Sequence, residues 1–308
     1  MKIPNYRFMA HSTKCIAVSA ALMVLILVAS LVIGVQLHIQ FSGGAIITYS
    51  YEGEVDAAAF AGTAGELTGA AVSVQLSTDL ATGMETIVLS LPAGDSLTTD
   101  QLATLDEGLY AAFPEAGLQV EEVNNVSAQM GSEFLMKCLI AVAFAAILMI
   151  VFVAFRFKRI GGMSAGVTAV IALVHNIIIV FGVHVFFGIP ISGPFIAAVL
   201  TVLGYSINDT IVIFDRIREN KRLFGDKKSL TELVDRSMNQ SLRRSINTTT
   251  TTVACMVIVA IVASFYNVGT IVTFVVPMSV GLMAGAYSSI FIAGPLWVRW
   301  QERSKAVA

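Results

Sequence analysis

Two polar residues interrupt an apolar stretch in the second half of the chain. The stretch reads TVLGYSINDTIVIF (201–214), and Asn208 and Asp209 stand near its middle. A carboxylate inside a bilayer costs roughly 2.5–3.5 kcal/mol on insertion scales, so a residue of this kind usually has a function there. A carboxyl group in such a place can exchange a proton and so alternate between a charged and a neutral form. Asp209 is therefore a candidate proton site. The alternative is a structural polar contact that caps a neighbouring helix.

Arg244 is the candidate partner of this carboxylate. It lies in SLRRSINTTTTTV (241–253), just before another apolar run. If the helix there begins earlier than hydropathy suggests, Arg244 can face Asp209 and hold the carboxylate charged until a proton breaks the pair. Alternatively, Arg244 is a positive flank whose side chain reaches the headgroups, and this second interpretation is favoured for Arg243.

Other polar and small residues lie within the apolar runs. Asn247 precedes a threonine run that begins at Thr248, and His175 lies in the third apolar run. Threonine hydroxyls in helices usually bond to a preceding carbonyl, although a hydroxyl-lined proton path is the alternative. A lone buried histidine more often satisfies a hydrogen bond than relays a proton. The spacing of Gly281 and Gly285 predicts close helix packing.

The composition is that of an α-helical membrane protein with several spans. Hydrophobic residues make up 56% of the chain and charged residues 13%, and the mean hydropathy is +0.79. An ordinary soluble domain has about 25% charged residues. The three cysteines lie in or beside apolar runs and are interpreted as small hydrophobic residues, not as disulfide or metal ligands. By length and apolarity, the predicted spans are 15–36, 134–155, 163–187, 193–214, 247–265 and 270–298.

Basic residues predict the orientation of the chain. No Lys or Arg occurs between Lys14 and Lys137, whereas the predicted loop 215–246 carries nine. The positive-inside rule places residues 1–14, this basic loop and the tail 299–308 in the cytoplasm, and residues 37–130 outside. The first span is expected to be an uncleaved anchor, because its apolar run is too long for a secretion signal.

Residues 37–130 are predicted to form one α+β domain outside the membrane. They contain thirteen Asp and Glu residues and no Lys or Arg. Alternating and helical patterns give the order β-α-β-β-α-β of a ferredoxin-like fold, with helices in 54–69 and 96–113. The strands are expected at 45–51, 71–77, 84–91 and 117–127. The acidity is typical of a solvated surface; alternatively it attracts basic client segments or repels anionic headgroups.

This domain carries no pattern of an enzyme. It shows no His/Cys metal cluster, no pairing of a nucleophile with a base and no phosphate-binding glycine loop. An extracytoplasmic enzyme, a metal cofactor and a nucleic-acid partner are therefore not expected. Gly43 and Gly44, in SGGA (42–45), are predicted to form a backbone turn where the first span meets the sheet.

Four segments together resemble the SecF family. This family is the smaller membrane subunit of the bacterial SecDF protein-export accessory complex, within the resistance-nodulation-division superfamily. The resemblance extends in order along nearly the whole chain and includes the six-span plan. The segments are FSGGA (41–45), GYSINDTIVIFDRIREN (204–220), LRRSINTTTTT (242–252) and GLMAGAYSSIFIAGPL (281–296).

The resemblance implies a function in the bacterial plasma membrane. SecF-like proteins pair with a six-span SecD subunit and assist unfolded preproteins that emerge from the SecYEG translocon, using the proton-motive force. Asp209 matches the family's intramembrane aspartate and Arg244 its arginine, and both belong to the proton-coupling site. Gly204, Asp215 and Arg216 belong to the same motif as Asp209. Protons are then the coupling ion, and no other cofactor is implied.

The chain departs from the family pattern at two positions. Gln40 stands where members usually carry Asp before the Phe of the FxGG motif, and Asn176 follows His175 where they commonly carry Asp. The second change casts doubt on a proton relay through the third span and leaves Asp209 and the partner subunit to carry the proton. Two alternative functions remain: half of a small-molecule or lipid efflux pump, and a passive scaffold of the export complex.

Overall fold

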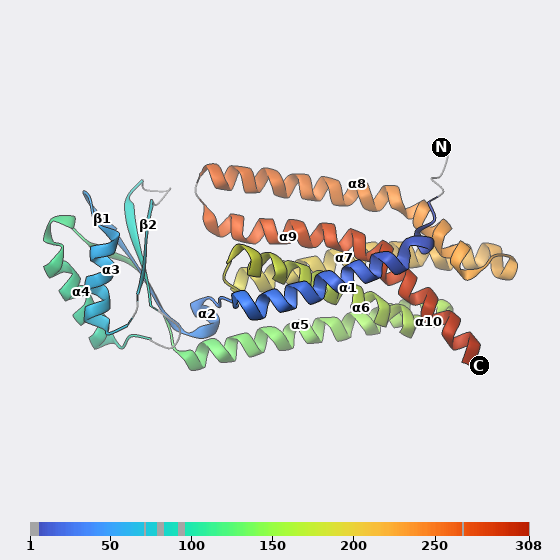
Figure 1. Ribbon diagram of the computed structural model, residues 1–308, viewed down its shortest axis with the longest axis horizontal. Helices are drawn as coiled ribbons and strands as arrows, with labels where there is room; N and C mark the ends of the chain where they lie inside the picture. Colours follow the sequence, from blue (N-terminus) through green and yellow to red (C-terminus); the bar gives the residue numbers. More distant parts are fainter. Residues whose placement is uncertain (1–5, 71, 79–82, 92–95, 267, 308) are drawn as a thin grey trace.

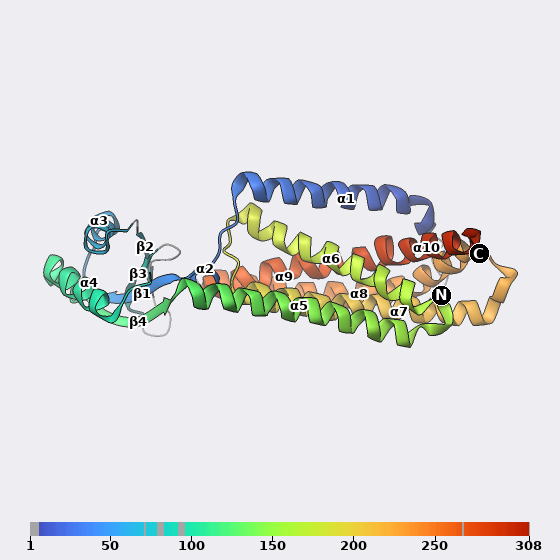
Figure 2. The same ribbon diagram turned by 90° about the horizontal axis from the view of Figure 1, so that it is seen from below.

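A small α/β domain lies at one end of the molecule and a bundle of long helices at the other (Figure 1). The computed structural model describes residues 6–70, 72–78, 83–91, 96–266 and 268–307. The first residues of the predicted N-terminal segment, the first residue of the predicted strand 71–77, most of the turn that follows it, and residue 308 lie outside the described residues. The C-terminal helix and the start of the first helix both lie at the end of the bundle away from the sheet (Figures 1 and 2).

Six helices in the described part of the chain are long and apolar enough to cross a membrane. The predicted fold class, a multi-pass α-helical protein with six spans, is confirmed. The sixth span consists of α9, a π-helical turn (η4, Ser289–Ala293) and α10. The bounds are α1 Phe8–Ile33, α5 Ala128–Arg156, α6 Gly162–Phe187, α7 Gly193–Phe224, α8 Leu230–Phe265, α9 Gly269–Ser288 and α10 Gly294–Val307.

The prediction of a loop over 215–246 is wrong, because most of this segment is helical. α7 continues to Phe224, and α8 begins at Leu230. Hydropathy marks only the part of a helix that matches lipid, whereas capping and packing decide where the helix ends. Ser229 caps α8 by accepting a hydrogen bond from the N–H of Glu232, and Met238 is fully buried. Arg244 therefore lies well inside a helix and not in a loop.

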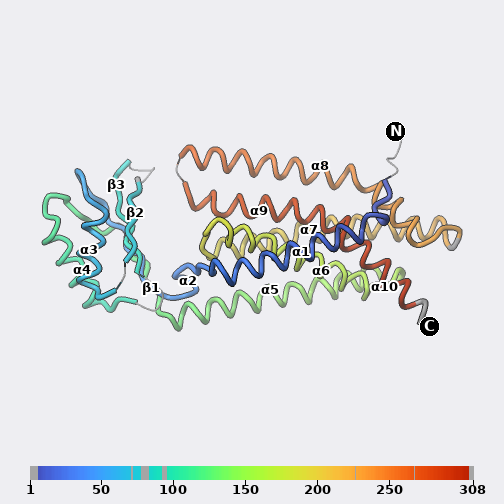
Figure 3. Tube along the Cα trace, in the orientation of Figure 1, coloured from blue at the N-terminus to red at the C-terminus, as the bar shows by residue number. Residues whose placement is uncertain are grey.

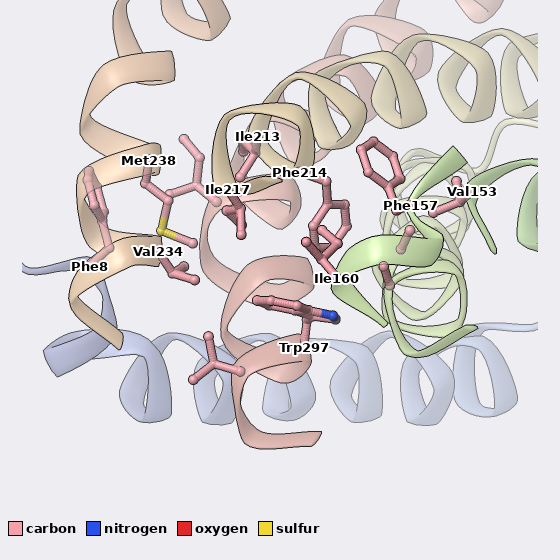
Figure 4. Packing of buried hydrophobic residues seen from close by; sticks show 14 residues of the cluster. Phe8, Val153, Phe157, Ile160, Ile213, Phe214, Ile217, Val234, Met238 and Trp297 are labelled. Atoms are coloured by element: carbon pink, nitrogen blue, oxygen red, sulfur yellow. The ribbon is translucent and has the colours of Figure 1, made fainter. Parts of the chain in front are cut away.

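An aromatic core stabilises the bundle at the end away from the sheet (Figure 4). Phe157, Phe214 and Trp297 come from three different segments and are almost fully buried. The rings of Phe214 and Trp297 pack edge to face, with centroids 5.9 Å apart. Phe8 of α1 and Met238 of α8 belong to the same cluster. This packing gives the extensions of α7 and α8 a fixed position beyond the apolar region.

The outer domain has the predicted ferredoxin-like order. Its four strands form an antiparallel sheet in the order β2-β3-β1-β4, and α3 and α4 follow β1 and β3 in the chain. The bounds are β1 Gly44–Tyr51, α3 Ala57–Thr68, β2 Ser73–Thr78, β3 Glu85–Ser90, α4 Thr99–Ala112 and β4 Gln119–Val126. Burial of alternate residues on β1 fixes the register, as in any sheet with one covered face.

Tyr49 anchors the core of this domain. Its ring is fully buried against Phe60, and its hydroxyl donates a 2.7 Å hydrogen bond to Oδ1 of Asp106 on α4. Burial and the neighbouring carboxylate both raise the pKa of Tyr49, so the phenol stays a neutral donor. The helices are thereby held against the sheet by a polar contact as well as by apolar packing.

The segment that connects α1 to the sheet runs beside the turn between α6 and α7 (Figure 3). The N–H of His38 donates to the carbonyl of Ile191 (2.9 Å), and the N–H of Ile191 donates to the carbonyl of Gln36 (2.8 Å). The side chain of Gln40, in the short helix α2 (Ile39–Ser42), accepts a 3.1 Å hydrogen bond from the N–H of Gly193, the first residue of α7. The outer domain is therefore joined directly to the start of α7.

The predicted turn at Gly43 and Gly44 is present and very tightly packed. Both residues have positive φ, 77° and 127°. A Cβ atom at Gly43 would lie 2.6 Å from the backbone of Ala128, at the start of α5. A Cβ at Gly131 would lie 2.8 Å from the backbone nitrogen of Gly43. The segment that enters the outer domain at Gly43 and the segment that leaves it at the start of α5 are therefore in direct backbone contact.

We expect Gly43→Ala to destabilise the protein strongly. Left-handed backbone costs a non-glycine residue about 1–2 kcal/mol, and the Cβ would in addition displace the backbone of α5. The matched control is Gly53→Ala, since Gly53 has a similar φ of 87° but a Cβ added there would meet no atom of the described residues within 4 Å. Thermal unfolding of the purified variants should show a clearly larger loss at Gly43; equal losses would contradict the close approach.

Candidate functional site

Asp209 is buried in α7 and faces α8. Only 4% of the residue is exposed, and its Oδ2 atom has no hydrogen-bond partner among the described residues. Ser245 and Arg244 of α8 lie beside the carboxyl group and act on its charge. The Oγ atom of Ser245 is also buried without a formed hydrogen bond in this part of the chain. The carboxyl group and the hydroxyl therefore face each other with hydrogen-bonding capacity to spare.

Thr249 extends this polar surface along α8. It lies one helical turn after Ser245, is buried, and its Oγ1 atom likewise lacks a partner within the described residues. By contrast, Thr248 donates to the carbonyl of Arg244 at 2.8 Å, and Thr252 donates to that of Thr248 at 2.9 Å. A buried polar group that is left unsatisfied costs about 1–3 kcal/mol, so unpartnered hydroxyls at Ser245, beside the carboxyl group, and at Thr249, on the same face of α8, indicate a functional site.

Arg244 lies within electrostatic range of Asp209, on the exposed side of α8. The structure places no direct ion pair between these two described residues: Oδ2 of Asp209 has no partner, and the hydroxyl of Ser245 lies next to the carboxyl group. The guanidinium can therefore stabilise a negative charge on Asp209 without a direct ion pair. A change in that charge would alter the attraction between α7 and α8.

A hydrogen-bonded chain from α6 reaches α7 one turn before Asp209. The amide nitrogen of Asn176 donates to Oγ of Ser206 (2.9 Å), and its oxygen lies 3.1 Å from Nδ1 of His175. All three side chains are buried, and Asn176 is fully so. His175 thus satisfies a hydrogen bond in the core, as the sequence favoured. The uncharged Asn176 holds α6 to α7 without a second carboxylate.

The sixth span completes this network from the other side. The hydroxyls of Thr210 and Ser289 lie 2.8 Å apart, and Ser289 also donates to the carbonyl of Ser206 (3.4 Å). Ser289 opens the π-helical turn η4. Such turns occur mostly as single insertions in α-helices and are frequent at functional sites. Here the turn brings a hydroxyl of the sixth span to the residue that follows Asp209.

The two predicted packing glycines lie where α9 approaches its neighbours. A Cβ atom at Gly281 would lie 2.5 Å from a methyl group of Val180 and 2.7 Å from one of Val202. At Gly285 it would lie 3.0 Å from Cβ of Ser206. A side chain at Gly281 would force its neighbours to shift, and one at Gly285 would make a contact tighter than most that Cβ atoms form. Gly285 therefore allows the close contact between the sixth span and the polar network.

Three other predicted site residues lie away from Asp209. Asn208 and Asn247 are exposed on the surface of the chain, on α7 and α8. A Cβ added at Gly204 would meet no atom within 4 Å in the part of the chain that the structure describes, in contrast to Gly281 and Gly285. Gly204 and Asn208 lie four residues apart on α7 and so share one exposed face of that helix.

Asp215 and Arg216 lie further along α7, in the basic end of the bundle. Asp215 pairs with Arg156 of α5 (3.0 Å) and with Arg218 (2.8 Å). Arg216 pairs with a glutamate one turn later on the same helix. Only the pair with Arg156 joins α5 to α7, since the other two lie within α7, and partly exposed pairs of this kind contribute little energy individually.

Sequence reasoning missed three hydroxyl residues of the site, Ser206, Ser245 and Ser289, and included Thr249 only as part of the threonine run that begins at Thr248. Ser245 lies beside the Asp209 carboxyl group, and Ser206 and Ser289 belong to the neighbouring hydrogen-bonded network. The helical period gave a signal for Ser245, because it lies four residues before Thr249 and on the same face of α8. No single-sequence signal points to Ser289, whose position depends on the π-helical turn.

Comparison with known proteins identifies the family of this fold and site. A model of the family described as "Protein export membrane protein SecD/SecF, C-terminal" matches residues 110–303. The chain belongs to the SecD/SecF family. The match includes β4 and every span from α5 onward, and therefore both Asp209 and Arg244.

Curated members of the family are about one-third identical to this chain over the residues that align. The protein translocase subunit SecF of Sebaldella termitidis is 34% identical over 85% of this chain and 81% of its own length. That of Alicyclobacillus acidocaldarius is 35% identical over 72% of this chain and 70% of its own length.

Solved structures show the same architecture within a longer chain. A crystal structure of SecDF from Thermus thermophilus, described as a translocon-associated membrane protein, has a TM-score of 0.78 and 30% identity. It matches 97% of this chain, which corresponds to 39% of the SecDF chain. SecDF in a super-membrane-facing form gives a TM-score of 0.70 over 99% of this chain. This chain thus corresponds to one part of the longer family members.

Proposed function

We propose that this chain is a SecF-type subunit that couples proton movement to protein export across the bacterial plasma membrane. It acts with a SecD-type partner and assists unfolded preproteins at the SecYEG translocon. Family membership and the shared fold support the export role. It is a transport subunit and not an enzyme, and the proton is its only coupling ligand.

The observation that carries the proton-coupling proposal is the state of the Asp209 carboxyl group. It is buried, lies near the Arg244 charge and faces a serine hydroxyl with no hydrogen bond formed to Oδ2. Ionised, the carboxylate attracts Arg244 and holds α8 to α7. When the carboxyl group is protonated, it loses that attraction and gains an O–H group, which can donate a hydrogen bond to the hydroxyl oxygen of Ser245. The two forms therefore favour different contacts between α7 and α8.

The position of α7 gives a route from this site to the outer domain. α7 is one continuous helix from Gly193 to Phe224. The N–H of its first residue, Gly193, donates a hydrogen bond to the side chain of Gln40. The backbone just before Gln40 forms hydrogen bonds with Ile191, in the turn that precedes α7. A shift of α7 after protonation of Asp209 would therefore move the base of the outer domain. In this scheme, that movement assists the preprotein.

The distribution of charge supports the orientation. The end of the bundle away from the sheet carries the basic residues around Arg156 and Arg218, and the outer domain is acidic. By the positive-inside rule, the basic end and both termini lie in the cytoplasm and the outer domain lies outside. The exposed surface at Gly204 and Asn208 is the face that a second six-span subunit would cover.

Export into proteoliposomes with an imposed proton gradient tests this proposal. Translocon, motor and SecD partner would be reconstituted with or without this chain. We expect the gradient to accelerate late export only when the chain is present. If the chain accelerates export equally with and without the gradient, the result would support the passive scaffold instead. Intact secretion combined with drug sensitivity in cells that lack the chain would support efflux.

A further inference from the structure

A groove between α6 and α10 opens at the basic end of the bundle. Its volume is about 760 Å³. Its lining includes Thr168, Ile171, Leu296, Arg299, Trp300 and Arg303. None of these residues takes part in the network around Asp209, so the proton-coupling proposal leaves this groove without a role.

The groove has an apolar floor and a basic mouth. Ile171 of α6 is 45% exposed, and Leu296 lies opposite on α10. Arg299 and Arg303 are one helical turn apart at the open end, with Trp300 between them at 43% exposure. Tryptophan and arginine together are typical of the level of the lipid headgroups, with apolar residues deeper in the bilayer.

The positive charge at the mouth is not neutralised by carboxylates of the described residues. Arg299 donates to the hydroxyl of Thr13 on α1 (2.6 Å), which is an uncharged partner. Neither Arg299 nor Arg303 forms an ion pair with a carboxylate in the part of the chain that the structure describes. Glu302, the acidic neighbour on α10, instead accepts a hydrogen bond from Thr231 of α8.

The other basic groove of this end differs in this respect. It lies between α5 and α7, and there Asp215 pairs with both Arg156 and Arg218. That groove therefore combines both signs of charge. The groove between α6 and α10 combines positive charge with an apolar floor, which is the pattern of a lipid site and not of a site for a soluble ion.

We propose that the groove between α6 and α10 binds an anionic phospholipid, with its phosphate between Arg299 and Arg303 and an acyl chain along Ile171 and Leu296. Basic pockets between membrane helices on the cytoplasmic side are suited to anionic headgroups. A zwitterionic lipid is disfavoured because its ammonium group would approach the same two arginines. Free phosphate makes no use of the apolar floor.

Tryptophan fluorescence in nanodiscs tests the proposal. The chain contains two tryptophans, of which Trp297 is fully buried and Trp300 lines the groove. Bromine atoms near the headgroup end of an acyl chain quench tryptophan at contact. The full chain would be placed in mixed phosphatidylglycerol and phosphatidylcholine, with one lipid brominated at a time. We expect a roughly thirtyfold preference for phosphatidylglycerol at Trp300, which is the size of effect that two interfacial arginines would give. Trp300→Phe should remove the preferential quenching.

Charge variants separate the groove from general surface charge. Arg299→Gln combined with Arg303→Gln should abolish the preference, whereas lysine at both positions should retain part of it. The matched control is Lys221→Gln with Arg222→Gln in the other basic groove, which should keep it. Equal quenching by both brominated lipids in the unchanged protein overturns the proposal. The proposal is also overturned if the control variant loses the preference for phosphatidylglycerol to the same extent. It is likewise overturned if inorganic phosphate, added at constant ionic strength, removes that preference.

Discussion

Asp209→Asn is expected to abolish the part of protein export that depends on the proton gradient. Asparagine has nearly the same shape as aspartate but cannot take up and release a proton at this site. The position is buried, and Oδ2 makes no hydrogen bond that the variant would lose among the described residues. The chain should therefore fold and assemble normally, with a change in the free energy of unfolding below about 1 kcal/mol.

Export by the Asp209→Asn protein is measured in the reconstituted system, with and without the gradient, and assembly by co-purification with the SecD partner. Glu219→Gln is the matched control, because Glu219 lies on the same helix but forms an exposed pair with Arg216. That control should keep the gradient-dependent rate. Full gradient-dependent export by the assembled Asp209→Asn protein would show that protons are not coupled through this residue.

Gly204→Trp is expected to prevent association with the SecD partner while leaving the isolated chain folded. A Cβ at Gly204 meets no atom of the described residues within 4 Å, and the position is exposed, so a side chain there can point away from the chain. The same face of α7 exposes Asn208 at membrane depth. A polar side chain there is best satisfied by a protein neighbour, and small residues allow helices to approach closely. Tryptophan at position 204 would hold the two subunits apart.

The Gly204→Trp experiment measures two quantities. Thermal unfolding of the isolated chain should be nearly unchanged, and co-purification with SecD should fall at least about tenfold, corresponding to about 1.4 kcal/mol. Ile147→Trp is the control, since Ile147 of α5 is exposed (57%) but lies in an apolar surface without polar residues nearby in sequence. Normal association of the Gly204 variant would exclude this face of α7 from the subunit contact.

The sequence was sufficient to predict the six spans and the order of the outer domain. Spans are identified by the length of apolar runs, which the bilayer thickness sets, and strands and helices by their different periods. The close approaches at Gly43, Gly281 and Gly285 were also indicated, because glycine at turns and helix crossings commonly marks a positive φ or a contact too close for a side chain.

The extents of α7 and α8 were not predicted from the sequence. Hydropathy reports which residues match lipid, and polar residues that continue a helix into water give no such signal. The extensions are stabilised by packing around Phe214, Met238 and Trp297, which are far apart in the chain. Contacts of this kind become visible only in three dimensions.

The polar residues of the site were predicted only in part. Asp209 was evident from its cost in lipid, whereas a polar residue such as Asn208 or Asn247 gives no indication of which way its helix face turns. Both are exposed, while the less conspicuous Ser245 and Thr249 point inward. The rotation of each helix follows from the packing of all its neighbours, and one short motif does not determine it.

The backbone contact between Gly43 and the start of α5 has a consequence for protein engineering. The outer domain leaves and re-enters the bundle at adjoining points, since a Cβ at Gly43 would lie only 2.6 Å from Ala128. A domain whose two ends meet is a self-contained cassette, and insertions of such units between neighbouring chain ends are generally tolerated. The intervening residues can therefore be exchanged for a reporter or a foreign domain with similarly close termini, and such a reporter would test whether the proposed shift of α7 reaches the outer domain.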